Sequence, residues 1–347
     1  MDRSKILRIK VPRKPSHQEQ KSVIEDISQI QVPKDDESSG ILLGDLDPGD
    51  EKALKSLKSQ SGRLMLYTSN GESVSLENWY RNNSAFLMLS GPSLNSYDLS
   101  QLGKRGIVTM GVNNSWAIYK PNLWVSVDDP GNFIDVGWKD PSIIKFCPMG
   151  SLNRRLVVKE GAEFRNSQFR TNDMPAVFYY RRNGKFNAET FLTENSVNWG
   201  NADDVTDHLG WKGSRSVMLS ALRLLYYLGF REVYLLGADF KMEFGSQNYA
   251  FQQDRHEGSV KGNNSIYRSL NDRFAALQPR FIQSNFKVYN CYEESGLRAF
   301  PHLSFSDAIA RASRTCSKAI DTEGWYDRKH REREAQKAAV AAEKEKK

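Results

Sequence analysis

The sequence predicts an α/β protein in which a mostly parallel sheet is flanked by helices. From Ser84 onward, short apolar runs alternate with helix-like segments, and these runs are FLMLSG, GIVTMGVNNS, LWVSVDDP, SIIKFCP, AVFYYRR, EVYLLGADF and FKVYNC. Runs of this length are typical of strands that are covered on both faces. Strands that alternate with helices usually join into a parallel sheet through right-handed crossovers.

The first apolar run ends at a sharp corner. Phe86 to Leu89 are apolar, and the run stops at Ser90-Gly91-Pro92. Ser93 follows at the place of a helix cap, so the backbone N–H groups after the corner can point at an anion or a ribose. The corner is therefore a candidate nucleotide-binding loop, although Gly and Pro are also common in ordinary turns.

The clearest predicted helix lies in GSRSVMLSALRLLYYLGF, where Val217, Ala221 and Leu228 follow helical spacing and Gly229 ends the run. Arg215 and Ser216 lie at its start. An arginine beside free helix N–H groups can bind phosphate, while Ser214 or Ser216 can equally be the N-cap.

The chain divides into four segments by composition. Residues 1–60 are rich in Lys, Asp, Glu, Ser and Pro, which predicts a disordered or extended arm. Residues 61–83 contain a candidate hairpin that turns at Asn70-Gly71. Residues 84–312 form the predicted nucleotide-binding transferase domain, and residues 313–347 form a charged helical tail, which is either a solvated helix or a basic arm that binds a partner.

Composition limits the class of protein and its surroundings. The 347 residues carry a net charge of +7 with a pI near 9.1, which favours anionic partners such as nucleotide phosphates, acidic glycans, nucleic acid or a membrane surface. Three separated cysteines fit neither a disulfide framework nor a CxxC metal site, so a cytoplasmic location is expected. No secretory signal or apolar run of membrane-spanning length is seen.

Polar side chains follow several of the predicted strands. They include Asn113, Asn114, Asp128, Asp129 and Asp239. Ligands of open α/β sheets bind outside the carboxyl ends of the strands, so these residues together favour a site there, whereas each corner alone is as well explained by a turn. Asp128 and Asp129 are candidate Mg²⁺ ligands or turn caps, and Asp239 can bind a ribose, orient a base or hold the next loop.

A long polar segment after Asp239, FGSQNYAFQQDRHEGSVKGNN, is typical of an active-site lid. His256 lies in it, and a loop histidine can accept a proton from an attacking hydroxyl near neutral pH. The alternative is a solvated histidine. The basic clusters SLNRRLVVK and FYYRRNGKF suit a polyanionic acceptor or simply solvated faces.

Five blocks resemble one superfamily: SGPSL, GVNNSW, PNLWVSVDD, YYLGFREVYLLGADF and NCYEESGLRAFPHLSFSDAI. It is the superfamily of bacterial sialyltransferases, flagellin-modifying motility accessory proteins and archaeal 6-hydroxymethylpterin pyrophosphokinases. The resemblance covers about residues 84 to 311. It implies a Rossmann-like fold that binds a nucleotide donor at the carboxyl edge of the sheet.

The sialyltransferase branch implies particular roles for residues of this chain. Its Gly-Pro-Ser corner and a downstream asparagine contact the cytidine nucleotide, and its lid histidine is the general base. The implied nucleotide-binding residues are Gly91, Pro92, Ser93 and Asn113 or Asn114, and His256 is the implied base. This chain has Ser90 where that branch has an asparagine, and its counterparts of the lid tyrosines are Tyr249 and Tyr267. This branch requires no metal.

Three hypotheses follow from the residues and the resemblance. In the first, a glycosyltransferase holds a nucleotide-sugar, such as a CMP-linked one, with Ser90 to Ser93, Asn113, Asn114, Ser214 and Ser216, and its catalytic residues are His256, Arg215 and Asp239. In the second, suggested by the pyrophosphokinase branch, Asp128 and Asp129 hold Mg²⁺ for pyrophosphoryl or nucleotidyl transfer from ATP. In the third, the domain is a non-enzymatic assembly or nucleic-acid-binding protein. The expected acceptor is a glycan, a protein or a nucleic acid, and a homo-oligomer is compatible with each hypothesis.

Overall fold

The computed structural model describes residues 63–81, 83–161, 163–201, 214–251, 257–314 and 323–344. They form a mixed α/β fold around a nine-stranded sheet with the order β13-β12-β3-β4-β5-β6-β9-β1-β2. Its parallel strands are β3 (Ser84–Met88), β4 (Val108–Val112), β5 (Leu123–Val125), β6 (Ile144–Pro148), β9 (Val177–Tyr180), β12 (Glu232–Leu236) and β13 (Lys287–Asn290). The predicted fold class is confirmed, and each apolar run contributes one of these strands.

The remaining strands lie at the far edge of the sheet or outside it. β1 (Leu66–Tyr67) and β2 (Ser73–Val74) form an antiparallel hairpin around Asn70-Gly71, and β1 also pairs with β9. Two small sheets are separate: β7 (Arg155–Glu160) with β8 (Glu163–Arg170), and β10 (Arg182–Asn183) with β11 (Val197–Asn198).

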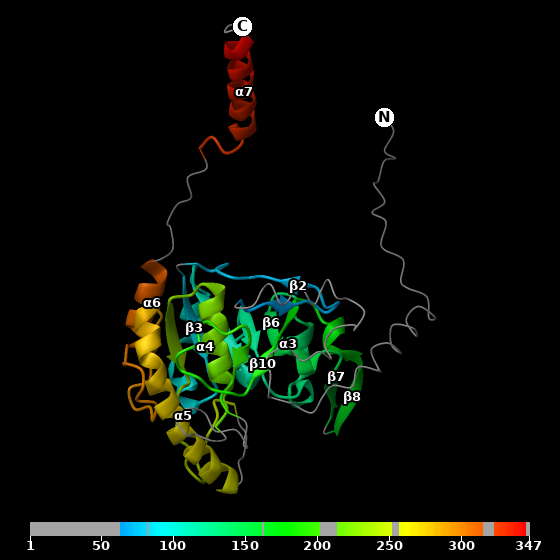
Figure 1. Ribbon diagram of the computed structural model, residues 1–347. Coiled ribbons are helices and arrows are strands. Elements are labelled where there is room, and N and C mark those ends of the chain that lie inside the picture. Colours follow the sequence, from blue (N-terminus) through cyan, green and yellow to red (C-terminus); the bar gives the residue numbers. More distant parts are fainter. Residues whose placement is uncertain are drawn as a thin grey trace.

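The helices of the described chain are α3 (Asp135–Lys139), α4 (Val217–Leu228), α5 (Glu257–Gln283), α6 (Phe305–Arg314) and α7 (Arg328–Lys344), with short 3₁₀ turns η2 (Pro92–Ser96), η3 (Leu99–Gly103), η4 (Asn113–Ala117), η5 (Pro130–Asn132), η6 (Met149–Ser151) and η7 (Thr171–Asp173). Helices α4 and α5 pack on one face of the parallel sheet, and α6 packs on the other. Figure 1 shows α4 over the strands, with α5 and α6 at the end of the molecule opposite the β7–β8 hairpin. In the described part of the chain, no helix has the length and apolarity needed to cross a membrane.

Strand β3 shows why its sequence is apolar without interruption. Successive side chains of a strand point to opposite faces of the sheet. Ala85 and Leu87 pack in the cluster formed with α4 and α5, while Phe86 and Met88 pack in the cluster that contains α6. Because both faces are buried, every position of the strand favours an apolar residue. The apolar run ends just after the strand, at Ser90.

Helix α4 has the boundaries that its sequence predicts. The Ser216 hydroxyl accepts a hydrogen bond from the N–H of Met218 (3.1 Å), which caps the first turn. Gly229 adopts φ +103° and ends the helix, and its N–H donates to the carbonyl of Tyr226. A side chain at this glycine would also meet the backbone of Asn78 at 2.8 Å. The helix therefore ends where the chain must turn into β12.

Candidate functional site

The strand order reverses at β3, and this positions the candidate site. β3 pairs with β4 on one side and with β12 on the other, so the strands of the two halves of the chain spread in opposite directions from it. Loops after neighbouring strands diverge at such a switch point and leave a crevice at the carboxyl edge, where open α/β sheets bind ligands. The Gly91 corner after β3 and the Gly237–Asp239 segment after β12 lie at this point.

Asp239 joins these two strand ends. Its two carboxylate oxygens accept hydrogen bonds from the N–H (3.1 Å) and the hydroxyl (2.6 Å) of Ser93. The N–H of Gly91 donates to the carbonyl of Gly237 (2.9 Å), and a Cβ on Gly91 would lie 2.0 Å from Asp239 Oδ2. The corner therefore requires glycine because the backbone at Gly91 passes directly against the Asp239 carboxylate.

The surroundings of Asp239 contain groups that raise its pKa and groups that lower it. The residue is only 5% exposed, and this burial raises the pKa of its carboxyl above the ordinary value. The hydrogen bonds from Ser93 and the positive charge of Lys241 lower the pKa and oppose the burial. Because burial is the larger effect, the carboxyl binds its proton more tightly than an exposed aspartate does.

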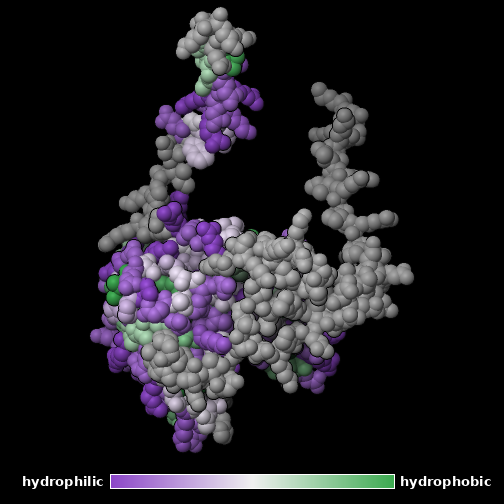
Figure 2. Space-filling model, viewed as in Figure 1, coloured by the Kyte–Doolittle hydropathy of each residue, from purple (hydrophilic) through white to green (hydrophobic). Residues whose placement is uncertain are grey.

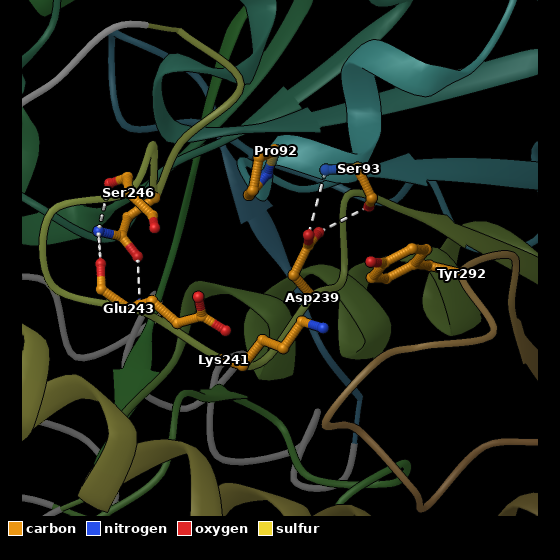
Figure 3. A pocket seen from close by; sticks show the side chains of 8 residues that line it. Pro92, Ser93, Asp239, Lys241, Glu243, Ser246 and Tyr292 are labelled. Carbon is orange, nitrogen blue, oxygen red and sulfur yellow. Dashed lines mark hydrogen bonds between the residues drawn. The ribbon is translucent and has the colours of Figure 1, made fainter.

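A pocket of about 290 Å³ opens beside this pair. Figure 3 shows Pro92 and Ser93 on one side of the pocket, Asp239 and Lys241 near its middle, and Glu243 and Ser246 on the opposite side from Tyr292. The lining residues are Pro92, Ser93, Asp239, Lys241, Glu243, Ser246, Asn248 and Tyr292. They come from the corner after β3, from the loop after β12 and from the segment after β13, so the pocket depends on the strand order.

Asn248 orders the loop that forms one side of the pocket. Its side-chain oxygen accepts from the N–H of Glu243 (2.8 Å), and its side-chain nitrogen donates to the carbonyls of Glu243 and Ser246 (both 2.9 Å). The loop is also tied to the corner, since the N–H of Ala250 donates to the carbonyl of Ser90 (2.9 Å). These bonds hold Glu243 in place with its carboxylate exposed.

The pocket offers groups that suit a small polar ligand. Lys241 provides a cation and lies 5.6 Å from the ring centre of Tyr292, while Glu243 provides an acceptor for hydroxyl groups. Tyr292 adds an aromatic side chain against which a planar ring can pack. The volume is near the lower end of the range of roughly 300 to 1,000 Å³ that is usual for small-molecule sites.

A second polar cluster lies after β4 and β5. Asn113 adopts φ +48°, and its side-chain nitrogen donates to Asp128 Oδ2 at 3.5 Å. Burial raises the pKa of Asp128, while Arg182 and Arg215 lower it. Both guanidinium groups lie against the ring of Trp199, at 3.8 Å for Arg182 and 4.8 Å for Arg215. The structure thus brings together Asn113, Asp128 and Arg215, which are far apart in the sequence.

Two side-chain oxygens in this region have unused hydrogen-bonding capacity. Asn113 Oδ1 and Asn114 Oδ1 are buried, and no described residue donates to either of them. The Asn113 carbonyl is engaged instead, since it accepts from the Trp124 indole N–H (2.7 Å). A buried amide oxygen normally has a donor, so these two atoms are suited to a ligand or a water molecule.

Of the two candidate cap residues at the start of α4, only Ser216 caps the helix. Ser216 is the N-cap, whereas Ser214 is buried and its carbonyl accepts from the N–H of Asn201 (3.2 Å) and from Arg273. Arg215 pairs by a single bridge with Gly200. The cap and the arginine are therefore both present at the helix start, as the sequence allows.

The Asp128–Asp129 pair does not present two similar carboxylates. Asp129 Oδ1 accepts from the N–H of Gly131 (2.8 Å) and caps η5, while Asp128 faces two arginines. In the described part of the chain, no group of three His, Cys, Asp or Glu side chains is placed to hold a metal ion. Asp129 therefore caps a turn, whereas the Asp128 carboxylate lies near the positive charges of Arg182 and Arg215.

His256, the predicted base, lies outside the described residues, and in the sequence it directly precedes Glu257, the first residue of α5. The two lid tyrosines are described. Tyr249 stacks on Phe251 with 5.4 Å between ring centres, and Tyr267 packs on Phe240 at 4.9 Å. Neither of them is among the residues that line the pocket.

Several site residues were not singled out from the sequence. They are Lys241, Glu243, Ser246, Asn248 and Tyr292 in the pocket and Trp199 in the second cluster, whereas Arg182 belongs to the basic run FYYRRNGKF. Ser246 and Asn248 lie in the predicted lid, and Tyr292 directly follows the strand end at Asn290-Cys291, so their positions carried a signal. Lys241 and Glu243 lie between Asp239 and the predicted lid. Trp199 carried none, because it belongs to neither a predicted strand end nor the lid.

Comparison with known proteins gives remote structural likeness alone. No family model and no curated protein matches the chain. Solved structures of the sialyltransferase CstII from Campylobacter jejuni do match. The complex with the substrate analogue cytidine-5'-monophosphate is 14% identical with a TM-score of 0.33, covering 69% of this chain and 89% of that chain. The complex with CMP-3FNeuAc is 15% identical with a TM-score of 0.34, covering 64% and 86%.

A further match is the sialyltransferase CST-II in complex with a trisaccharide acceptor and CMP, at 14% identity and a TM-score of 0.32, covering 64% of this chain and 86% of that chain. With TM-scores this low, the likeness to these enzymes decides neither the activity nor the ligand of this chain.

Proposed function

We propose that the protein is a glycosyltransferase that uses a nucleotide-sugar donor, with the nucleotide bound in the pocket beside Ser93 and Asp239. The observation that carries the proposal is the position of this pocket at the switch point of a parallel sheet, where β3 and β12 diverge. The resemblance of the SGPSL and LGFREVYLLGADF blocks to sialyltransferases supports the same conclusion and favours a CMP-linked donor.

The pocket groups suit the parts of a nucleotide in a definite way. The Gly91 corner allows a close approach of the backbone, and the Glu243 carboxylate is an acceptor for ribose hydroxyls. Lys241 is positioned to neutralise a phosphate, and Tyr292 offers its ring to the base. Asp239 is a positioning residue in this proposal, because Ser93 occupies both of its oxygens.

The transfer itself needs a base and a stabilised leaving group. His256 accepts the proton of an acceptor hydroxyl, the hydroxyl oxygen attacks the anomeric carbon of the sugar, and the bond from that carbon to the phosphate oxygen breaks. The nucleotide leaves with the bonding electrons. Arg215 and Lys241 supply positive charge for the developing phosphate anion. The acceptor is a glycan or protein hydroxyl.

The two alternative functions predict different ligands. Pyrophosphoryl or nucleotidyl transfer at Asp128 and Asp129 requires ATP with Mg²⁺, although the turn-capping role of Asp129 disfavours it. An assembly or nucleic-acid-binding role requires no nucleotide at the pocket. A screen of CMP, CDP, UDP, GDP, ADP and ATP, each with and without Mg²⁺, therefore separates the three functions by thermal shift.

We expect CMP to raise the melting temperature without Mg²⁺, because a ligand that binds only the folded state stabilises it by about 2.7 kcal/mol at a hundred times its Kd. Ser93→Ala should weaken CMP binding, while His256→Ala should leave it nearly intact and abolish release of CMP from a CMP-linked sugar. Gly103→Ala is the matched control, since a Cβ there meets nothing within 4 Å.

A shift that needs both ATP and Mg²⁺ would contradict the glycosyltransferase proposal and favour Asp128 and Asp129. Absence of any nucleotide shift would favour the binding or assembly role. Equal turnover in wild type and His256→Ala would remove the base assignment alone.

A further inference from the structure

A patch of exposed apolar side chains lies at the β7–β8 hairpin, away from the candidate site. Four exposed apolar residues of the described chain gather there: Ile134 (46% exposed), Val136 (62%), Phe164 (68%) and Phe169 (40%). Figure 2 shows hydrophobic atoms beside strongly hydrophilic ones where Figure 1 places the hairpin. Single exposed apolar residues are ordinary, but a gathered group on one projection indicates an interaction surface.

The pairing of the strands places part of this group on one face. Lys159 and Phe164 are opposite each other in the β7–β8 ladder, so their side chains leave the same face. Val157, two residues before Lys159, shares that face, and Ile134 pairs with Val157 in a single parallel bridge. One face of the hairpin therefore carries Ile134, Val157, Lys159 and Phe164 in a row from its base towards its tip.

Cations accompany the exposed aromatic rings. The Lys159 amine lies 5.8 Å from the centre of the Phe164 ring, and the Lys139 amine lies 5.5 Å from that of Phe169. Residues 154–170 contain five basic side chains and two acidic ones, and both glutamates pair with Arg165. The four other basic residues, Arg154, Arg155, Lys159 and Arg170, leave the hairpin positively charged.

We propose that the β7–β8 hairpin docks on the surface of an anionic lipid bilayer. With this face of the hairpin against the bilayer, Phe164 near the tip can enter the boundary between headgroups and acyl chains, and Lys159 beside it can contact anionic headgroups. Arg155 and Arg170 add positive charge at the base of the hairpin. The charge of the whole chain, +7, acts in the same direction. Ile134 and Val157 in the same row favour a lipid surface over a nucleic acid, because aliphatic side chains suit acyl chains but offer no ring on which a base can stack.

The test uses the full-length protein and sedimentation with vesicles. We expect binding to vesicles of equal parts phosphatidylcholine and phosphatidylglycerol, weak binding to vesicles of phosphatidylcholine alone, and a decrease in binding as salt is added. Phe164→Ser should reduce the partition coefficient by about tenfold, the loss expected for one buried aromatic side chain. Lys159→Gln should reduce it by about fivefold.

Ile282→Ser is the matched control, because Ile282 is 75% exposed on α5, far in the sequence from the hairpin, and its loss should leave vesicle binding unchanged. Circular dichroism of each variant checks that it is folded. Equal binding to both vesicle types, or binding unaffected by Phe164→Ser, would overturn the proposal. So would a dimer in sedimentation velocity, or a nucleic-acid complex, that Phe164→Ser abolishes while vesicles remain unbound.

Discussion

Gly91 determines how closely the ends of β3 and β12 approach. The N–H of Gly91 donates to the carbonyl of Gly237. A Cβ at position 91 would lie 2.5 Å from that carbonyl oxygen and would also clash with the Asp239 carboxylate. The Gly237 carbonyl belongs to the backbone directly after β12, so it cannot move aside as the end of a flexible side chain would. The glycine is therefore a condition for the Ser93–Asp239 pair and for the pocket beside it.

We predict that Gly91→Ala destabilises the protein by about 1 to 3 kcal/mol, the range usual for an overpacked buried position, and removes nucleotide binding at the pocket. Urea denaturation followed by circular dichroism measures the first effect, and thermal shift with CMP measures the second. Gly103→Ala, which adds the same methyl group in open space, should change stability by less than about 0.5 kcal/mol. Similar results for the two variants would show that β3 and β12 separate easily.

The raised pKa of Asp239 gives a pH dependence of known sign. In the unfolded chain the carboxyl loses its proton near the ordinary pKa of 3.8, but in the folded protein it does so at a higher pH. Between these two values the folded state binds more protons than the unfolded state, so the stability that Asp239 contributes falls as the pH rises.

We therefore predict that the free energy of unfolding of wild type minus that of Asp239→Asn decreases as the pH rises above 3.8, then becomes constant. Urea denaturation at a series of pH values measures this difference. Asp98→Asn is the control of opposite sign, because hydrogen bonds from Ser100 and Gln101 lower the pKa of the exposed Asp98. An increasing difference for Asp239 would show that the Ser93 hydrogen bonds outweigh its burial.

Among the elements, α4 depends on a single side chain for its first turn. The first four N–H groups of a helix have no partner within the helix, and Ser216 satisfies that of Met218. We predict that Ser216→Ala destabilises the protein by about 1 kcal/mol, as is typical for the loss of an N-cap. Ser216→Asn keeps an acceptor and should stay close to wild type in urea denaturation. An equal loss in both variants would mean that the hydroxyl has another role.

The parallel strands and α4 could be predicted because each is specified by its own residues. The apolar runs are buried on both faces, and Ser216 and Gly229 mark the helix ends. The β7–β8 hairpin could not be predicted, since most of β8 is exposed on both faces and lacks an alternating pattern.

The burial of Lys145 in β6 could not be predicted from the sequence either. Lys145 is fully buried, and its amine donates to the carbonyls of Asp140, Ile143 and Pro175. Only the folded chain brings these carbonyls together.

The residues of the candidate site also divide into those that local sequence predicts and those that only the tertiary fold brings together. Ser93, Asn113, Asp128 and Asp239 were predicted because each one follows a strand. That Ser93 binds Asp239 depends on β12 lying next to β3, and strand order is a property of the tertiary fold that local sequence does not contain. Lys241 and Tyr292 reach the pocket for the same reason.

For the molecule as a whole, two buried cysteines report on whether the sheet unfolds as one unit. Cys147 on β6 packs in the cluster around Trp124 and Trp138, whereas Cys291 after β13 packs in the cluster around α6. Burial raises the pKa of both thiols to about 12, so neither forms the reactive thiolate at neutral pH. The nine-stranded sheet runs without interruption between the two positions.

We predict that in Cys316→Ser neither remaining thiol reacts with a thiol reagent in the native protein, and that both become reactive at one urea concentration. The reason is that parallel strands which share ladder hydrogen bonds and a common core tend to unfold cooperatively. Adding Cys147→Ala or Cys291→Ala to Cys316→Ser leaves one thiol at a time, so that pulse labelling gives a midpoint for each end of the sheet. Two different midpoints would show that the sheet consists of two units, and the cysteine with the lower midpoint would identify the less stable end.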